Sequence, residues 1–208
     1  MSLVVDVVVV AGGIALVRWV LRRARRNAPV RAEAAGREGA SDAPRASELL
    51  AGFPCKLGDV VLRSAERDEA WLAGALVFLE DRPVAALFSA PEAGGDRALF
   101  VRAAPGAGIT WLAPLAPGVL DVPKEPPHAL ELDGVRFERA RRLPVDVKRV
   151  GSGAPPVGAR AVVAEYTGPA NQRLLVVAGA DATLAWKGAS LGDGEYDVLP
   201  GGGGEDGE

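Results

Sequence analysis

The pattern of hydrophobic and polar residues divides the chain into an apolar N-terminal run and a longer region of short apolar stretches. Residues 3–21, LVVDVVVVAGGIALVRWVL, contain two charged side chains, Asp6 and Arg18, and end directly before RRARR. A helix over this range is about 28 Å long, close to the hydrocarbon thickness of a bilayer. Both charges lie near its ends, where they are best tolerated. The run therefore predicts a single transmembrane helix, with these anchor residues: Val7, Val10, Ile14, Leu16 and Trp19.

After residue 50 the apolar residues occur in short runs separated by turn residues. These runs predict strands at 59–63, 71–79, 84–88, 98–102, 109–112, 129–132, 135–140, 145–150, 160–166, 173–177, 183–186 and 196–199. Turn sequences such as EDRP, EAGGD, PGAG, LDGV and GDGE separate most of them. No long amphipathic run follows residue 50, which argues against alternating strands and helices. The predicted fold class is mainly β, a barrel or a sandwich, preceded by the transmembrane helix.

Two parts of the β-region resemble each other. RALFV at 97–101 followed by ITW at 109–111 has a counterpart in RLLVV at 173–177 followed by TLAW at 183–186. Two similar β-subdomains or chance similarity between valine-rich strands can explain this echo. The predicted organisation is an anchor with a basic stop (1–26), a flexible tether (27–50), a first β-subdomain (51–117), a proline-rich linker (118–128), a second β-subdomain (129–200) and a disordered acidic tail (201–208). Within this scheme SELLAGF, residues 47–53, favours a brief helix with Ser47 as its cap.

The arginines after the apolar run predict its orientation. Arg22, Arg23, Arg25 and Arg26 follow the run, whereas the preceding MSLVVD has no basic side chain. Basic residues beside a span stay in the cytoplasm, where they also meet the lipid headgroups. A cleaved secretory signal has the opposite order, with basic residues before its apolar core. We therefore expect a single-pass protein of the bacterial inner membrane, with its N-terminus outside and its main domain in the cytoplasm. A periplasmic β-domain behind an uncleaved signal anchor is the alternative.

Charge and residue usage limit the functions that the β-region can have. The formal net charge is −3, and the first 31 residues carry six arginines against Asp6, so the remainder is acidic. An acidic body disfavours nucleic acid as a partner. The single cysteine, Cys55, and the single histidine, His128, cannot supply a zinc site rich in nitrogen and sulfur or a Cys–His catalytic pair. The sequence predicts no catalytic, cofactor-binding or metal-binding residue. An acid–base pair among carboxylates remains as the enzyme alternative: Glu80, Asp81, Glu165 or Asp193.

Two sets of residues are candidates for binding a partner. The segment 134–150, GVRFERARRLPVDVKRV, carries the dense basic patch Arg136, Arg139, Arg141, Arg142, Lys148 and Arg149. This patch suits an acidic partner or the inner leaflet, and a solvated strand face with cross-strand ion pairs is the alternative. The second set is aromatic: Trp71, Trp111, Tyr166 and Trp186. Aromatic residues are enriched at interfaces, but in a chain with few of them we expect these four to lie in the core.

Residues 130–200 resemble the bacterial family described as domain of unknown function 4178. The resemblance is carried by LDGVRFERARR (132–142), APPVGARAVVAEYTG (154–168) and RLLVVAGADATLAWKGASL (173–191), and LGDVVL (57–62) is similar to the start of the family domain. It implies a β-rich module without an established activity, often found beside membrane proteins. Members frequently carry a cysteine-rich metal ribbon, and with Cys55 alone that role does not carry over. The expected function is a membrane-anchored interaction or scaffolding module whose partners are lipid and a protein.

Overall fold

The computed structural model describes residues 46–66, 68–92, 95–104 and 108–201. The predicted anchor residues Val7, Val10, Ile14, Leu16 and Trp19, the arginines at 22, 23, 25 and 26, and the tail from residue 202 lie outside this part of the chain. Among the described residues, no helix has the length and apolar character needed to cross a membrane.

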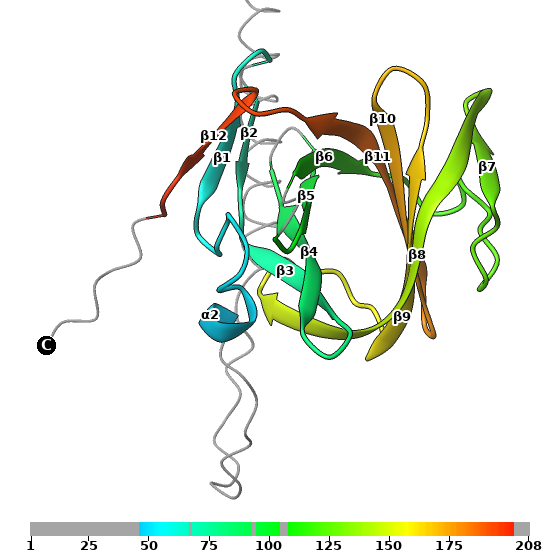
Figure 1. The fold of residues 1–208 in the computed structure, drawn as a ribbon, viewed down its shortest axis with the longest axis horizontal. Helices are drawn as coiled ribbons and strands as arrows, with labels where there is room; N and C mark the ends of the chain where they lie inside the picture. Colours follow the sequence, from blue (N-terminus) through cyan, green and yellow to red (C-terminus); the bar gives the residue numbers. More distant parts are fainter. Residues whose placement is uncertain (1–45, 67, 93–94, 105–107, 202–208) are drawn as a thin grey trace, which may run out of the picture. The chain divides into compact units, whose positions relative to one another are not determined.

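The centre of the fold is a closed barrel of eight antiparallel strands (Figure 1). The first four are β3 (Gly74–Leu79), β4 (Pro83–Ala90), β5 (Arg97–Arg102) and β6 (Ile109–Pro114). The other four are β8 (Val135–Gly151), β9 (Arg160–Thr167), β10 (Gln172–Gly179) and β11 (Thr183–Leu191). Each set is a meander of consecutive strands, and the pairs β6–β11 and β3–β8 close the ring. The predicted mainly β fold is thus confirmed, in the form of a barrel.

In the described ranges, four further strands and one short helix lie outside the ring. β1 (Val60–Arg63), β2 (Asp68–Trp71) and β12 (Tyr196–Leu199) form a three-stranded sheet in the order β12-β1-β2. The helix α2 (Ala46–Leu49) precedes this sheet, and β7 (Ala129–Leu132) pairs with the first part of β8. The two-residue turn between β7 and β8 has positive φ at Asp133 and Gly134, as the Asp-Gly signal predicts. Figure 1 shows the three-stranded sheet and β7 on opposite sides of the barrel.

Apolar side chains pack inside the barrel and also between the barrel and its two covers. Leu76, Phe78 and Phe100 belong to the interior cluster. Outside, one cluster lies between β3–β6 and the three-stranded sheet with α2, and another packs β9–β11 against β7 and the segment 115–128. Strands such as β3 and β10 are therefore buried on both faces over most of their length, which explains why GALVFL and LLVVA are continuous apolar runs and do not alternate.

Two predicted strand boundaries change in the structure. The run 71–79 is two strands, because Trp71 ends β2 in the outer sheet whereas Gly74 begins β3 in the barrel. Conversely, 135–140 and 145–150 are one continuous strand, β8, which bends through an irregularity between Arg139 and Arg141. Leu49 and Leu50, which the sequence places at the end of the tether, are buried in the core.

The two halves of the β-region contribute equally to the barrel. The hairpins that echo each other in sequence are β5–β6 and β10–β11, and each forms the second half of its meander. β6 and β11 pair side by side, so the echoed hairpins are neighbours in the ring. The two predicted subdomains thus share one closed sheet and one interior.

Candidate functional site

One end of the barrel interior, which we call the mouth, is lined by polar side chains. These are Arg102, Thr110, Glu165, Arg173 and Ser190. Each comes from a different strand and lies within three residues of that strand's end: β5, β6, β9, β10 and β11. Because side chains alternate along a strand, four of them share the inward side with an apolar side chain two positions deeper, whereas Ser190 has Gly188 at that position. The mouth is therefore a polar layer above an apolar interior.

The mouth encloses a cavity of about 170 Å³. Phe100, Leu112 and Leu175 line it together with the polar side chains, and all three are buried members of the interior cluster. A cavity with an apolar floor and a few convergent polar groups is the common form of a small-molecule site.

The mouth contains an ion pair between Arg102 and Glu165, in which only one of the two carboxylate oxygens has a hydrogen-bond partner among the described residues. Arg102 donates from Nε to Oε2 of Glu165 at 3.1 Å, and its Nη2 donates to the same oxygen. The side chain of Glu165 is 13% exposed, against 42% for Arg102. The other carboxylate oxygen, Oε1, is buried and has no hydrogen-bond partner among the described residues. An unpaired buried acceptor of this kind is unfavourable, so Oε1 is suited to a donor that enters the cavity.

Three further polar groups in the mouth have spare hydrogen-bonding capacity. Arg173 donates from Nη1 to the carbonyl of Gln172 at 3.0 Å, which leaves most of its guanidinium donors unused. No hydrogen bond within the described chain engages the hydroxyl of Thr110 or Ser190. With two guanidinium groups against one carboxylate, the cavity lining has a formal charge of +1.

The carboxylates of the enzyme alternative do not converge on this cavity. Glu165 is the only acidic residue among those that line it. Glu80 and Asp81 lie exposed between β3 and β4, and Asp193 is exposed between β11 and β12. No group of three or more His, Cys, Asp or Glu residues in the described ranges is placed to hold a metal ion.

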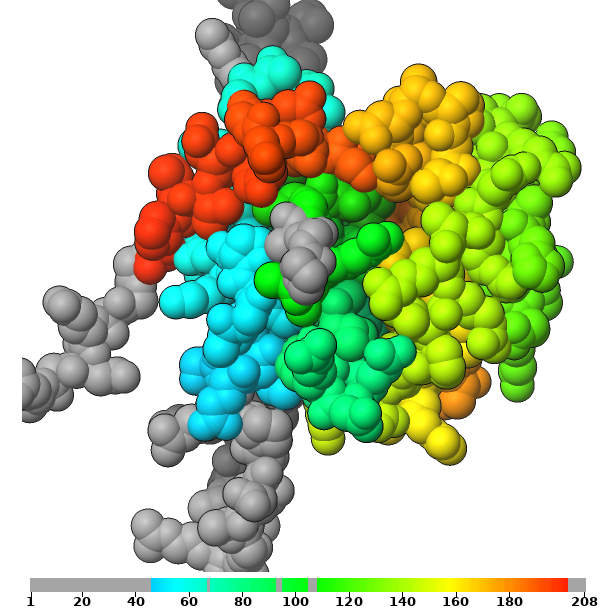
Figure 2. Space-filling model, viewed as in Figure 1, coloured from blue at the N-terminus to red at the C-terminus, as the bar shows by residue number. Residues whose placement is uncertain are grey.

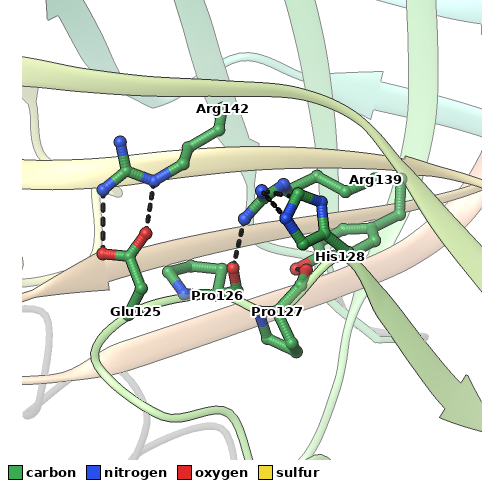
Figure 3. A network of polar contacts seen from close by, with 7 residues as sticks. Glu125, Pro126, Pro127, His128, Arg139 and Arg142 are labelled. Carbon is green, nitrogen blue, oxygen red and sulfur yellow. Dashed lines mark hydrogen bonds and ion pairs between the residues drawn. The ribbon is translucent and has the colours of Figure 1, made fainter.

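The predicted basic patch lies along β8, and half of it is engaged within the domain (Figure 3). Arg142 forms an ion pair with Glu125 at 2.6 Å. Arg139 donates to the carbonyl of Pro126, and one of its nitrogens lies 3.1 Å from Nδ1 of His128. These two arginines thus fasten the proline-rich linker to the barrel.

The other members of the patch point to solvent or to their own strand's neighbours. Arg149 donates to the carbonyl of Ala154 at 2.6 Å. Arg136 is exposed and lies 3.5 Å from Glu138. Arg141 and Lys148 are exposed, and no described residue pairs with their side chains. The structure therefore spreads the six residues along β8 and engages Arg139, Arg142 and Arg149 internally.

Three of the four aromatic residues expected in the core are buried there, and the fourth is not. Trp111, Trp186 and Tyr166 are buried, whereas Trp71 is 55% exposed. Trp71 ends β2, on the opposite side of the strand from the buried Ala70. The alternation in DEAW was the available signal, because it places Trp71 on the same face as Glu69.

Trp71 belongs to an apolar row across the outer face of the three-stranded sheet. Val60 on the central strand pairs with Trp71 on one side and with Leu199 on the other. Leu199 is 48% exposed, and the residues next to this row on the same face include Leu62 on β1 and two acids, Glu69 and Asp197. Figure 2 shows β12 (red) and β1 (cyan) side by side at the surface. We call this row and its acidic neighbours the outer sheet face.

Comparison with known proteins assigns no relative to this chain. No family model, no curated protein and no solved structure matches it. The similarity to the family of unknown function 4178 therefore stays a prediction, and function has to be argued from the residues themselves.

Proposed function

We propose that this protein is a membrane-anchored interaction module. In this proposal the N-terminal helix holds the chain in the bacterial inner membrane, with the N-terminus outside. The β-domain then lies in the cytoplasm, where it binds a protein partner through the outer sheet face. The observation that carries the proposal is the apolar row of half-buried Val60 between exposed Trp71 and exposed Leu199.

The composition of this face indicates the chemistry of the partner. Tryptophan is among the residues that contribute most to protein interfaces, because it buries a large area at low entropic cost. Here it stands beside two aliphatic side chains, and Glu69 and Asp197 flank them. A partner segment with apolar side chains next to lysine or arginine complements both features.

The basic patch supports an interaction role less well than the outer sheet face, and the enzyme alternative lacks a pair of carboxylates in the mouth. Arg139, Arg142 and Arg149 of the basic patch are already engaged inside the domain. The enzyme alternative requires two carboxylates that face one cleft. Glu165 is the sole carboxylate lining the mouth; Glu80 and Asp81 are on an exposed turn beside a wide, open hollow that Asp146 also lines, and Asp193 is on another exposed turn.

Site-specific crosslinking in membranes tests the binding face. A photoreactive phenylalanine analogue replaces Trp71 in the full chain, and a second chain carries it at Val119, an exposed apolar residue outside the sheets (50% exposed). We expect one adduct of defined mass at position 71 and none at position 119. Leu199→Asp in the first chain should abolish the adduct, because it puts a charge in the apolar row, whereas Val119→Asp should leave it intact. No adduct at position 71, or the same adduct at both positions, would refute the proposed face.

Two simpler experiments test the anchor and the orientation. The full chain should stay in sedimented vesicles after a carbonate wash, because a helix that spans the bilayer is not released by high pH. A reporter that is active only in the cytoplasm should be active when it is fused after Glu208, and a reporter that requires the periplasm should be inactive there. Release by carbonate would contradict the anchor, and activity of a periplasm-dependent reporter would reverse the topology.

A further inference from the structure

The mouth of the barrel holds an acceptor and several donors that no described residue uses. Oε1 of Glu165 is buried without a partner, even though both donating nitrogens of Arg102 go to the neighbouring Oε2. The guanidinium of Arg173 and the hydroxyls of Thr110 and Ser190 line the same cavity. These groups lie on separate strands of a closed barrel, so the backbone fixes the positions from which their side chains reach the cavity. This site shares no residue with the outer sheet face.

The charge and the size of the cavity define the ligand. The formal charge of its lining, +1, is balanced by a monoanion. Its volume of about 170 Å³ is close to that of an engineered cavity that accommodates benzene, so it admits about six non-hydrogen atoms. The apolar floor of Phe100, Leu112 and Leu175 suits a carbon end and excludes a second charge at that depth.

We propose that the mouth binds a small carboxylate that carries a hydroxyl group beside the carboxyl, that is, a 2-hydroxycarboxylate of three or so carbons. The carboxylate accepts hydrogen bonds from Arg173, with the hydroxyls of Thr110 and Ser190 as further donors. The ligand hydroxyl donates to Oε1 of Glu165, the oxygen that lacks a partner in the folded chain. The carbon end lies over the apolar floor. One ligand thus satisfies both the free donors and the free acceptor.

A ligand series on the unaltered full chain in detergent micelles tests this assignment. The probes are L-lactate, propionate and L-alanine, and binding is followed by calorimetry or by ligand-observed NMR. Propionate lacks the hydroxyl and leaves Oε1 unpaired, so its dissociation constant should be about tenfold higher than that of lactate. Alanine replaces the hydroxyl with an ammonium and has no net charge, so it should also bind more weakly than lactate.

Paired variants then locate the site. Arg173→Gln should weaken lactate binding at least tenfold, because it removes the charged donor to the carboxylate. Arg160→Gln is the matched control: it removes an exposed arginine that does not line the cavity, and it should leave binding unchanged. The proposal is overturned if lactate does not bind, if propionate or alanine binds as tightly, or if Arg173→Gln binds lactate like the unaltered chain. The probe series needs no variant, so a folding defect in Arg173→Gln does not affect it.

Discussion

The hydroxyl of Tyr166 allows the packing of the proline-rich linker to be measured. Tyr166 lies on β9, is completely buried, and donates a hydrogen bond to the carbonyl of Pro127 at 2.9 Å. The ring belongs to the cluster that the linker and β7 cover. Tyr166→Phe keeps the ring and removes the hydroxyl, so it isolates this one bond.

At neutral pH the variant should be less stable than the unaltered chain. A neutral hydrogen bond contributes about 1 kcal/mol net, and leaving its partner unsatisfied in a buried place increases the loss. We therefore expect Tyr166→Phe to lower the free energy of unfolding by about 1 to 2 kcal/mol at pH 8.

The difference in the free energy of unfolding between the two chains should shrink and then change sign as the pH rises. Burial raises the pKa of Tyr166 from its ordinary value of 10.0 to about 12, with a smaller opposing effect from Arg139. Between these two values the unfolded chain loses the phenol proton while the folded chain keeps it, so the unaltered protein loses stability as the pH rises. The full loss is about 2 to 3 kcal/mol, of which about half has occurred at pH 11. The phenylalanine variant has no such loss, so the two stability curves should cross near pH 11.

Urea unfolding of both full chains in detergent, followed by tryptophan fluorescence from pH 8 to 11.5, measures this difference. All other titrating groups are common to the two chains and cancel in the comparison. Parallel curves over the whole range would refute the reasoning, since they would mean that the hydroxyl of Tyr166 is as well solvated in the folded as in the unfolded chain. A crossing well below pH 10 would also contradict it.

Three further predictions concern the framework of the domain. Gly188→Ala should lower stability by about 3 kcal/mol, because a Cβ there would lie 1.8 Å from a backbone oxygen of β6; Gly192→Ala, whose Cβ has ordinary contacts, should change it by less than about 0.5 kcal/mol. Asp59→Ala should lower stability by about 2 to 4 kcal/mol and speed amide exchange in β12, because the Asp59 carboxylate accepts from the N–H of Lys56 and from the N–H of Gly201, just after β12. The exposed Asp197→Ala is its control, with a change within about 0.5 kcal/mol. Burial, assisted by Asp59, raises the pKa of the Cys55 thiol to about 12, so iodoacetamide at pH 8 should modify the folded chain on the order of a thousandfold more slowly than the urea-unfolded chain. Equal rates would contradict that burial.

The positions of most strands could be predicted from the sequence because turns have a local signal. Asp133-Gly134 between β7 and β8 is an example, since both positions of this turn need positive φ, which aspartate tolerates and glycine adopts freely. The break after Trp71 has no such signal: Leu72 and Ala73 continue the apolar run, and only the departure of β2 into another sheet separates the strands. Likewise the union of two predicted strands into β8 depends on a long-range partner, because its second half pairs with β3.

The candidate sites were harder to predict than the strands, for a physical reason. Arg102 and Glu165 are 63 residues apart, and they meet because β5 and β9 contribute to the same end of the barrel. The spacing of residues along the sequence does not indicate which strand ends meet when the barrel closes. The sequence distinguishes Glu165 only as one of several carboxylates, and it contains no signal that singles out Arg102 or Arg173. The basic patch on β8 was visible as a composition, but the use of Arg139 and Arg142 to hold the linker depends on where the linker returns.

The two covers of the barrel restrict where ligands can reach it. The three-stranded sheet with α2 packs on β3–β6, and β7 with the segment 115–128 packs on β9–β11, so those outer barrel faces are already buried. The mouth stays open to a small ligand and the outer sheet face to a partner, and a further open hollow lies beside the turn between β3 and β4. The mouth and the outer sheet face share no residue, although β11 leads into β12 and the three-stranded sheet packs on β3–β6. Leu199→Asp should therefore abolish crosslinking at position 71 and leave lactate binding unchanged, whereas Arg173→Gln should do the reverse. A variant that removed both would show that the packing of the three-stranded sheet on the barrel couples the mouth to the partner.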